Sequence, residues 1–419
     1  MAISLFCLLL IAFASLILLG KKIKRSKWNL PPSPPKFPVI GNLHQLGELP
    51  HRSLQRLAER TGHVMLLHLG FVPVTVISSK EAAEEVLRTH DLDCCSRPKL
   101  VGTRLISRGF KDVGFTPYGE EWKERRKFLV REFFCLKKVQ SFGYIREEEC
   151  NFLVKKLSES AVDRTPVDMS KTLFWLTASI LFRVASGQSF HESKFIDKDK
   201  VDELVFEAET AQASFTCSDF FPIAGLGWIV DCISGQHKRL KDVFFKLDAL
   251  FQGVIDDHLH PGRRSEDHRD IVDIMLDVMH KQGKDISLKL TINNIKGILT
   301  VQGYNIPPKT RILVNAWAIG RDPKVWTNPE EFNPERFINS PLDYSGQHFE
   351  LLPFGSGRRV CPGMAMGMAT VELGLLNLLY FFDWKLPDGM THKDIDTEEA
   401  GTLTIVKKVP LKLVPVRVQ

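Results

Sequence analysis

The chain has 419 residues, of which 44% are hydrophobic and 25% are charged, enough apolar material for one large globular unit or two moderate ones. Its formal net charge of +6 does not indicate a nucleic-acid partner, because five of the positive charges lie in the short run from Lys21 to Lys27. Residues 28–419 carry a net charge of only +1. The composition thus indicates a folded, nearly neutral domain behind a basic segment.

Cysteine and histidine usage excludes two further classes of protein. The eight cysteines show no regular spacing and no Cys-x-x-Cys pair, which indicates a reducing compartment instead of a disulfide framework. None of the thirteen histidines forms a His-Glu-x-x-His or His-x-x-x-His pattern, so we expect no zinc or other histidine-ligated metal.

Residues 1–20 are expected to anchor the chain in a membrane. The stretch from Ala2 to Leu19 is apolar apart from two serines and a cysteine, and a helix needs about 20 such residues to cross a bilayer. Positive charge follows this stretch and does not precede it, which favours an uncleaved anchor over the alternative of a cleaved secretory signal. By the positive-inside rule the basic run then lies on the cytosolic side.

Residues 21–38 form a basic and proline-rich linker between this anchor and a globular domain at 39–419. Proline-rich runs such as Pro31 to Pro35 are extended and semi-rigid, so we expect a stiff spacer. The alternative, a ligand for an SH3-type domain, fits less well because the run lies between an anchor and a fold.

The first elements of the domain combine a small sheet with helices. A helix is expected around Leu54 to Arg60, followed by strands at Val64–Leu69 and Val74–Ile77 that flank a turn. Ser78 with Glu81 then predicts a capping box at the start of a helix that runs toward His90.

Trp122 and Arg126 lie four residues apart, so on a helix they share a face and can reach one target together. The alternative for this pair is an ordinary amphipathic helix with a solvated arginine. From about Phe128 to His280, helical apolar patterns alternate with polar loops, and no catalytic constellation stands out.

Further on, Thr291 is a plausible N-cap for a helix that continues to Thr300. Arg311 to Val314 predicts a strand, and Leu403–Val406 with Val409–Val414 predict two more at the end of the chain.

Cys361 lies in the loop Phe354-Gly355-Ser356-Gly357-Arg358-Arg359-Val360-Cys361-Pro362-Gly363. Glycines allow the backbone to approach a flat, bulky group, and the apolar run from Met364 to Phe382 predicts a helix with its N-terminus at Pro362. A helix N-terminus and nearby cations favour a thiolate over a thiol, so the loop suits an anionic sulfur ligand. The ordinary alternative is a small buried hydrophobe.

This loop resembles the haem-binding loop of the cytochromes P-450, Phe-x-x-Gly-x-Arg-x-Cys-x-Gly. Phe354, Gly357, Arg359, Cys361 and Gly363 fill every fixed position. The resemblance implies that Cys361 is the axial thiolate of a haem iron and that Arg359 pairs with a haem propionate. The alternative for Arg359 is a solvated surface arginine.

Two further motifs extend the resemblance over most of the chain. The family's Trp-x-x-x-Arg helix, which contacts the haem propionates, is filled by Trp122 and Arg126, and Pro334-Glu335-Arg336-Phe337 matches the Pro-Glu-Arg-Phe segment of plant members. The resemblance to the plant microsomal type implies a mainly α fold with a small β region.

The resemblance is interrupted between Thr300 and Val301. There the family continues into an Ala/Gly-Gly-x-Asp/Glu-Thr proton-relay motif and a Glu-x-x-Arg helix, and neither is present, so most of the distal helix and all of the Glu-x-x-Arg helix are missing. No catalytic residue can therefore be assigned. Arg336 also loses the buried partners that the family provides, and breaking such an ionic set typically costs about 3–5 kcal/mol.

The family resemblance implies a haem-thiolate monooxygenase that inserts one oxygen atom from O2 into a small lipophilic substrate, with electrons from NADPH through NADPH-cytochrome P-450 reductase. It also implies a single-pass protein of the endoplasmic reticulum membrane with a cytosolic haem domain. The alternative is a non-catalytic haem-binding or interaction protein, or an unstable truncated product of a monooxygenase gene. The substrate cannot be read from the sequence.

Overall fold

Helices dominate the part of the chain that the computed structural model describes, which is residues 28–189, 201–213, 216–222, 225–260, 270–281, 299–401 and 405–418. The α-helices are α2 (Pro50–Thr61), α3 (Lys80–Glu84), α4 (Asp91–Cys94), α5 (Val101–Ile106), α6 (Glu120–Leu129), α7 (Leu136–Ser141), α8 (Gly143–Asp163), α9 (Met169–Ser186), α10 (Val201–Ala213), α11 (Cys217–Phe220), α12 (Leu226–Ile233), α13 (Gln236–His258), α14 (Ile271–Lys281), α15 (Ala316–Ile319) and α16 (Met364–Phe381).

Short helical turns of other kinds connect these elements. Two are π-helical, η2 (Glu85–Thr89) and η3 (Val130–Phe134), and four are 3-10 turns, η1 (Leu43–Gln45), η4 (Pro334–Phe337), η5 (Gly357–Arg359) and η6 (His392–Asp394).

The strands form small sheets, as the mainly α fold class with a small β region predicts. They are β1 (Val64–Leu69), β2 (Val72–Ile77), β3 (Val167–Asp168), β4 (Leu299–Val301), β5 (Tyr304–Ile306), β6 (Arg311–Val314), β7 (Phe382–Lys385), β8 (Glu399–Gly401), β9 (Ile405–Lys407) and β10 (Lys412–Arg417). Two three-stranded sheets have the orders β1-β2-β6 and β3-β10-β7, and β4-β5 and β8-β9 are two-stranded.

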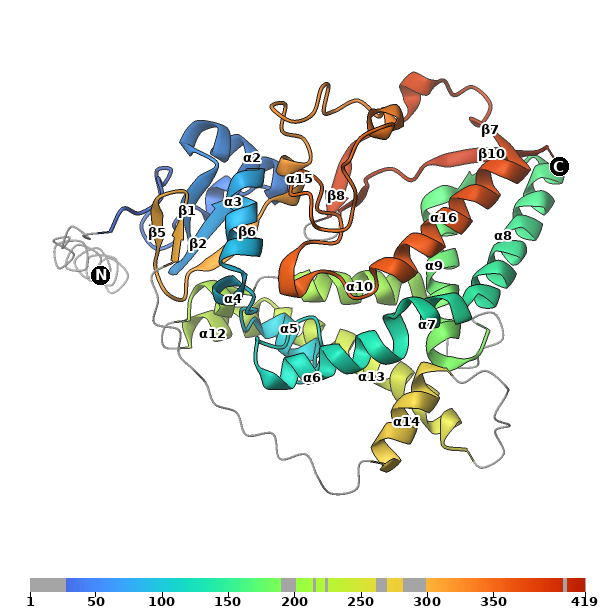
Figure 1. Ribbon diagram of the computed structural model, residues 1–419, viewed down its shortest axis with the longest axis horizontal. Coiled ribbons are helices and arrows are strands. Elements are labelled where there is room, and N and C mark those ends of the chain that lie inside the picture. The colour runs from blue at the N-terminus through green and yellow to red at the C-terminus, as the bar shows by residue number, and fades with distance from the viewer. Residues whose placement is uncertain are drawn as a thin grey trace, which may run out of the picture.

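The core has a sheet part and a helical part at opposite ends of the molecule (Figure 1). Buried side chains of β1 and β2 pack with those of α2 and α3, while α8, α9 and α16 share the largest apolar cluster. The predicted strand at Val64–Leu69 is confirmed, the next begins two residues earlier than expected, at Val72, and the one at Arg311–Val314 is confirmed. Of the two predicted C-terminal strands, the first is observed at Ile405–Lys407, with its predicted start at Leu403 outside the described residues, and the second begins later than predicted, at Lys412.

The capping box predicted at Ser78 and Glu81 is wrong. The Ser78 N–H donates to the carbonyl of His63 at 2.8 Å, so this residue still belongs to the end of the strand. Ser79 is the N-cap of α3 instead, and its hydroxyl accepts from the Ala82 N–H at 3.3 Å. The Ser78 hydroxyl is buried without a hydrogen-bond partner among the described residues.

The helix predicted from Thr291 to Thr300 is wrong at its end, and residues 291–298 lie outside the described residues. Leu299 and Thr300 belong to β4, which pairs with β5 in a hairpin. Its two loop residues, Gln302 and Gly303, have φ of 46° and 76°, as a type I′ turn requires. Thr300 therefore belongs to the same hairpin as Val301, which is completely buried.

Arg336 in η4 has other partners in place of the ionic set expected from the family. Its guanidinium donates to the carbonyls of Asn333, Thr327, Asn328 and Glu331 at 2.8–3.2 Å. It makes no ion pair within the described part of the chain. Local backbone carbonyls therefore satisfy the donors of this arginine.

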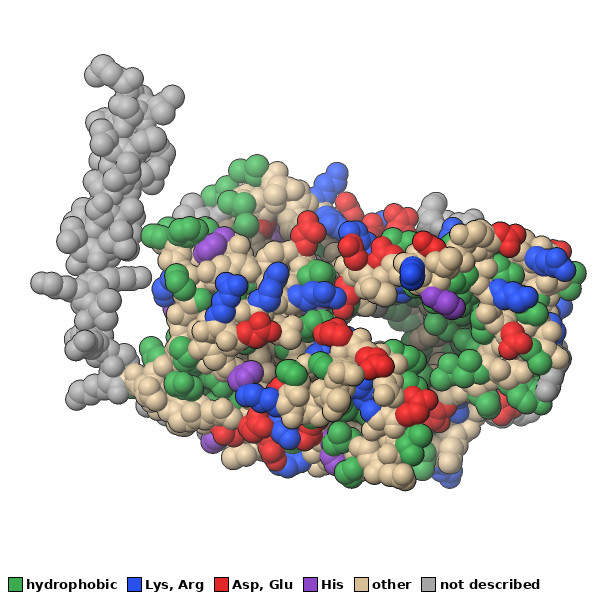
Figure 2. Space-filling model, turned by 90° about the horizontal axis from the view of Figure 1, so that it is seen from above, with side chains coloured by type: hydrophobic (Ala, Val, Ile, Leu, Met, Phe, Trp, Pro, Cys, Tyr) green, Lys and Arg blue, Asp and Glu red, His purple; other side chains and the backbone are tan. Residues whose placement is uncertain are grey.

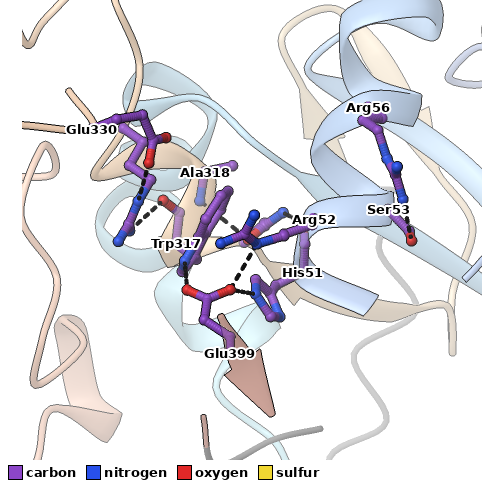
Figure 3. Close-up of polar contacts among 10 residues, drawn as sticks. His51, Arg52, Ser53, Arg56, Trp317, Ala318, Glu330 and Glu399 are labelled. Atoms are coloured by element: carbon purple, nitrogen blue, oxygen red, sulfur yellow. Dashed lines mark hydrogen bonds and ion pairs between the residues drawn. The ribbon is translucent and has the colours of Figure 1, made fainter. Parts of the chain in front are cut away.

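Glu399 in β8 joins the C-terminal part of the chain to the sheet part (Figure 3). One carboxylate oxygen accepts from His51 at 2.9 Å and from Arg52 at 2.7 Å, and the other accepts from the Trp317 indole at 3.1 Å. Burial alone would raise the pKa of Glu399, but the hydrogen bonds from Arg52, His51 and Trp317 outweigh burial and lower it to about 2.

The Glu399 network should make stability pH-dependent. A folded-state pKa below the usual value means that the stabilisation is present above about pH 4.5 and is lost as the pH falls toward 2, by up to about 3 kcal/mol. In urea unfolding, Glu399→Gln should lower the free energy of unfolding at pH 7, with the difference from wild type shrinking below pH 4.5. Glu398→Gln, at an exposed neighbour paired with Lys408, is the matched control. A pH-independent difference would contradict this assignment.

Candidate functional site

The loop of Cys361 lies between η5 and α16, at the N-terminal end of the long apolar helix. The Cys361 N–H donates to the carbonyl of Phe354 at 2.9 Å, which closes the loop, and the thiol is free and partly buried. The Phe354 ring lies against Gly367 in the first turn of α16. The predicted helix after the loop is confirmed, with Gly363 as its N-cap.

Two glycines of this loop, Gly355 and Gly357, adopt left-handed conformations with φ of 71° and 66°. A Cβ on Gly357 would lie 2.3 Å from the carbonyl oxygen of Leu87 and 2.9 Å from a carboxylate oxygen of Asp91. A Cβ on Gly355 would meet no heavy atom within 4 Å. Close packing of the loop against η2 and α4 therefore requires glycine at 357, whereas at 355 only the backbone conformation favours it.

Arg358 holds the loop to α4. Its guanidinium forms an ion pair with Asp91 at 2.5 Å, and its N–H lies 3.3 Å from both oxygens of that carboxylate. Asp91 is buried, and this pairing raises the pKa of Arg358. The charge of Arg358 is thus paired with Asp91. It is therefore not available to stabilise a thiolate at Cys361, as the sequence predicts.

Arg359 points into the protein in a different direction. Its guanidinium donates to the carbonyls of Cys95 at 2.7 Å, Val113 at 3.3 Å and Thr116 at 2.7 Å. The same group stacks over the Trp122 ring, 4.1 Å from its centroid. Arg359 is partly buried, so the alternative of a solvated surface arginine does not describe it.

Trp122 and Arg126 lie on one face of α6, as their spacing predicts. Arg126 donates to the carbonyl of Val360 at 2.6 Å, next to Cys361, and burial lowers the pKa of Arg126 although Cys361 opposes this shift. Trp122 is buried, and its indole N–H donates to the carbonyl of Val113 at 2.9 Å. The ring of Trp122 therefore supports both guanidiniums, while its N–H already has a partner within the protein.

Arg97 belongs to the same group of cations, although no sequence motif points to it. Burial, together with the charges of Arg97 and Arg126, lowers the pKa of Arg359 to about 10. Desolvation also lowers the pKa of Arg97 and of Arg126. The Arg97 side chain is nevertheless exposed.

These three arginines, Arg97, Arg126 and Arg359, make no ion pair with any described residue. Their contacts are with backbone carbonyls, which neutralise a charge only partly, and partly desolvated cations of like sign disfavour one another. The arrangement would be stabilised by an anionic group placed among them. Asp91 and Arg97 are the two residues here that sequence analysis missed, because both act on the loop from about 260 residues away.

The molecule is hollowed near the middle of the face shown in Figure 2, and hydrophobic side chains gather along one side of the hollow.

A second group of potential ligands lies apart from this loop, in His258, Asp270 and Asp273, whose side-chain atoms come within 4.8 Å of one another. One His258 nitrogen faces Asp270 at 2.9 Å and the other faces the carbonyl of Val254 at 2.7 Å. Asp270 also accepts from the Asp273 N–H at 2.8 Å, at the start of α14. Contacts within the protein thus account for this cluster, which joins the end of α13 to the start of α14.

The sequence profile of the family described as "Cytochrome P450" matches residues 31–300 and 294–413. The chain belongs to this family. Family membership implies a haem with a cysteine thiolate ligand, a redox partner and, in general, a lipophilic substrate.

Plant proteins are among its most similar relatives. The chain is 70% identical to cytochrome P450 71B17 and 68% identical to cytochrome P450 71B19 of Arabidopsis thaliana, with all of both chains covered. It is 48% identical to cytochrome P450 71B7 of the same plant, with 98% of each chain covered. These matches confirm the resemblance to the plant type.

The interruption predicted after Thr300 is also present in these comparisons. The family profile matches in two stretches that meet at residues 294–300, and the alignment with 71B17 is 502 positions long against 419 residues in this chain. At least 83 positions of the alignment therefore have no counterpart here. The break in the profile match agrees with the interruption predicted after Thr300.

The described residues fit the proximal side of a haem. Cys361 offers a partly exposed sulfur, and the cations Arg97, Arg126 and Arg359 suit two carboxylates, which are the charged groups of the haem periphery. The structure brings together every site residue predicted from the sequence: Trp122, Arg126, Phe354, Arg359, Cys361 and Gly363.

A matched pair of glycine variants should test the packing of the loop. Gly355→Ala and Gly357→Ala should each lose about 1 kcal/mol because alanine disfavours the left-handed conformation. Gly357→Ala should lose a further 1–3 kcal/mol, roughly the penalty of overpacking, because its Cβ overlaps the Leu87 carbonyl. Urea unfolding of both variants measures the difference. Equal losses would show that α4 and η2 do not constrain the loop.

Proposed function

We propose that this chain holds a haem through Cys361 and is a haem-thiolate monooxygenase that acts on a small lipophilic substrate. The observation that supports the proposal is the group of arginines beside the Cys361 loop, the partly buried Arg126 and Arg359 with the exposed Arg97, which have no ionic partner among the described residues. Such a group is costly unless anions bind to it. The propionates of a haem ligated by Cys361 would provide those anions.

Each residue of the site has a role in this proposal. Cys361 ligates the iron; Arg126 and Arg359, with Arg97, hold the propionates; and Trp122 supports the two guanidiniums that stack on it. Phe354 and Gly363 fix the two ends of the loop. When bound, a haem with a thiolate ligand supplies the chemistry that inserts one oxygen atom from O2 into a substrate. No residue is assigned to proton delivery, because the motif for it is missing.

The proposal extends to partners and location. Electrons would come from NADPH through NADPH-cytochrome P-450 reductase. Residues 1–20 would anchor the chain in the endoplasmic reticulum membrane as a single span, residues 21–38 would be the linker, and residues 39–419 would form the cytosolic haem domain. Residues 1–27 lie outside the described part of the structure.

The interruption after Thr300 favours a second candidate. With at least 83 positions missing, the chain would be a non-catalytic haem-binding or interaction protein, or an unstable product of a monooxygenase gene. The two candidates share the proximal haem site and differ in turnover.

Reduction of the purified chain under carbon monoxide tests the haem site. A haem with a thiolate ligand gives a distinctively red-shifted Soret band, which we expect for the wild type and not for Cys361→Ala. Cys217→Ala, at another partly buried free cysteine, should leave the band unchanged. Absence of the band in folded protein, or its persistence in Cys361→Ala, would overturn the proposal.

The same preparation separates the two candidates. A monooxygenase should couple NADPH oxidation to product formation when reductase and a panel of lipophilic substrates are present. NADPH oxidation without product would favour the non-catalytic candidate.

The chain should also stay with membranes during an alkaline carbonate wash, and its release would contradict the anchor.

Two adjacent arginines distinguish propionate binding from a general effect of charge. Arg359→Gln should weaken haem binding by about 10–100-fold, the magnitude of one lost charge-assisted hydrogen bond. Arg358→Gln should change it by less than about threefold, because Arg358 is paired with Asp91. Arg359→Lys should restore part of the affinity, since it restores the charge. Haem titration of the apoprotein measures all three, and equal losses at 358 and 359 would contradict the assignment.

A further inference from the structure

A buried arginine without an ionic partner lies near the start of α8. Arg146 is only 7% exposed. Its guanidinium forms no ion pair with any residue that the structure describes, and its one hydrogen-bond contact there joins Nη1 to the Sδ of Met366 in α16, at 3.3 Å. A thioether sulfur is a weak acceptor and carries no charge. The cation of Arg146 is therefore enclosed without a compensating anion.

The acidic residues that follow Arg146 on α8 do not supply this anion. Glu148 and Glu149 both pair with Arg183 of α9. Glu147 is exposed; its charge raises the pKa of Arg146, but desolvation is the larger effect and lowers that pKa. Because an arginine does not lose its proton in a protein, the cation remains, and an added anion would lower the free energy of the folded state.

The guanidinium of Arg146 faces the N-terminal end of α8. A Cβ on Gly143, the first residue of the helix, would lie 3.8 Å from Nη2 of Arg146, and beyond the adjoining backbone it would meet no other heavy atom within 4 Å. The N-cap, Phe142, makes no side-chain hydrogen bond to the helix, and the first turn contains no acidic residue. The N–H groups and the dipole of a helix N-terminus attract anions. The guanidinium and the positive end of α8 thus border one open space.

These two groups together suit a phosphate group better than a carboxylate. A guanidinium binds two oxygens of such an anion side by side, and the N–H groups of a helix N-terminus bind further oxygens. A phosphate group has enough oxygens to accept from both at once, whereas a carboxylate has only two oxygens to share between them.

We propose that the N-terminal end of α8 and Arg146 together bind a phosphate group, either of a soluble phosphate or of an anionic phospholipid headgroup. The inference requires neither haem binding nor turnover, so it stands or falls separately from the proposed function. A bound phosphate would compensate the charge of Arg146 and stabilise the contact that this arginine makes with Met366, and hence the packing of α8 on α16.

Urea unfolding of the full chain in a neutral detergent tests the proposal, with inorganic phosphate added and the ionic strength held constant with chloride. The free energy of unfolding should rise with phosphate and then saturate, as for a ligand that binds only the folded state. Arg146→Met keeps the bulk of the side chain and removes its charge. It should bind phosphate at least about tenfold more weakly. Without phosphate it should be at least as stable as the wild type, because an unpaired buried charge is gone.

A second variant tests the same space without removing the arginine. Gly143→Asp places a carboxylate of the chain itself at the N-terminus of α8, beside the guanidinium. It should be more stable than the wild type in chloride and should no longer respond to phosphate. Gly143→Ala, whose Cβ would lie at an ordinary contact distance, is the matched control and should keep the response.

Two further arginines control for a general effect of charge. Arg60→Met, at an exposed position in the last turn of α2, should leave the response to phosphate unchanged. Arg359→Gln should leave it unchanged as well, which separates this site from the cations beside the Cys361 loop.

The source of the phosphate group is identified by replacing the detergent with bilayers of phosphatidylcholine, alone or mixed with phosphatidic acid. Stabilisation by phosphatidic acid that Arg146→Met abolishes would identify a lipid headgroup, and stabilisation by inorganic phosphate alone would identify a soluble phosphate. Three results would overturn the proposal: equal stabilisation by chloride and phosphate, an unchanged response in Arg146→Met or Gly143→Asp, and loss of the response in Arg359→Gln.

Discussion

The guanidinium of Arg359 is the contact on which the cysteine loop depends. Its donors reach three backbone carbonyls between 243 and 264 residues away along the chain, and its plane rests on the ring of Trp122. Backbone carbonyls fix the position of a guanidinium without cancelling its charge. The residue that orders the loop therefore also remains available to an anion, so the folding of this region and its binding chemistry rest on one side chain.

Sequence reasoning succeeded where the signal is local and failed where it depends on distant contacts. The strands at Val64–Leu69 and Arg311–Val314 follow from runs of apolar residues between turns, and the helix after Cys361 follows from its apolar length. The N-cap of α3 is Ser79 and not Ser78, because the Ser78 N–H donates to the His63 carbonyl across the sheet. The end of the predicted distal helix became a strand because a two-residue turn allows Thr300 to pair with Asn305.

The same distinction holds within the site. The cysteine motif and the Trp122–Arg126 spacing identified the loop and the helix that faces it, since each is a pattern of neighbouring residues. Arg358 forms an ion pair, whereas Arg359 binds backbone carbonyls. This difference could not be read from the sequence, because it depends on Asp91, 267 residues away from Arg358. Arg97 was missed for a similar reason, since its relation to Arg359 exists only in the folded chain.

The interruption after Thr300 affects polar and apolar groups differently. The donors of Arg336 bind carbonyls of its own loop. This is possible because each donor needs only one acceptor, and any nearby backbone carbonyl can be that acceptor. An apolar surface cannot be satisfied by one atom, because its stabilisation grows with the area removed from water. The side of α16 that carries Leu375, Leu376 and Leu379 is exposed and has no such cover within the described chain. Apolar helix surface therefore stays exposed on α16, while the polar network around Glu399 and the cysteine loop has its partners within the described chain.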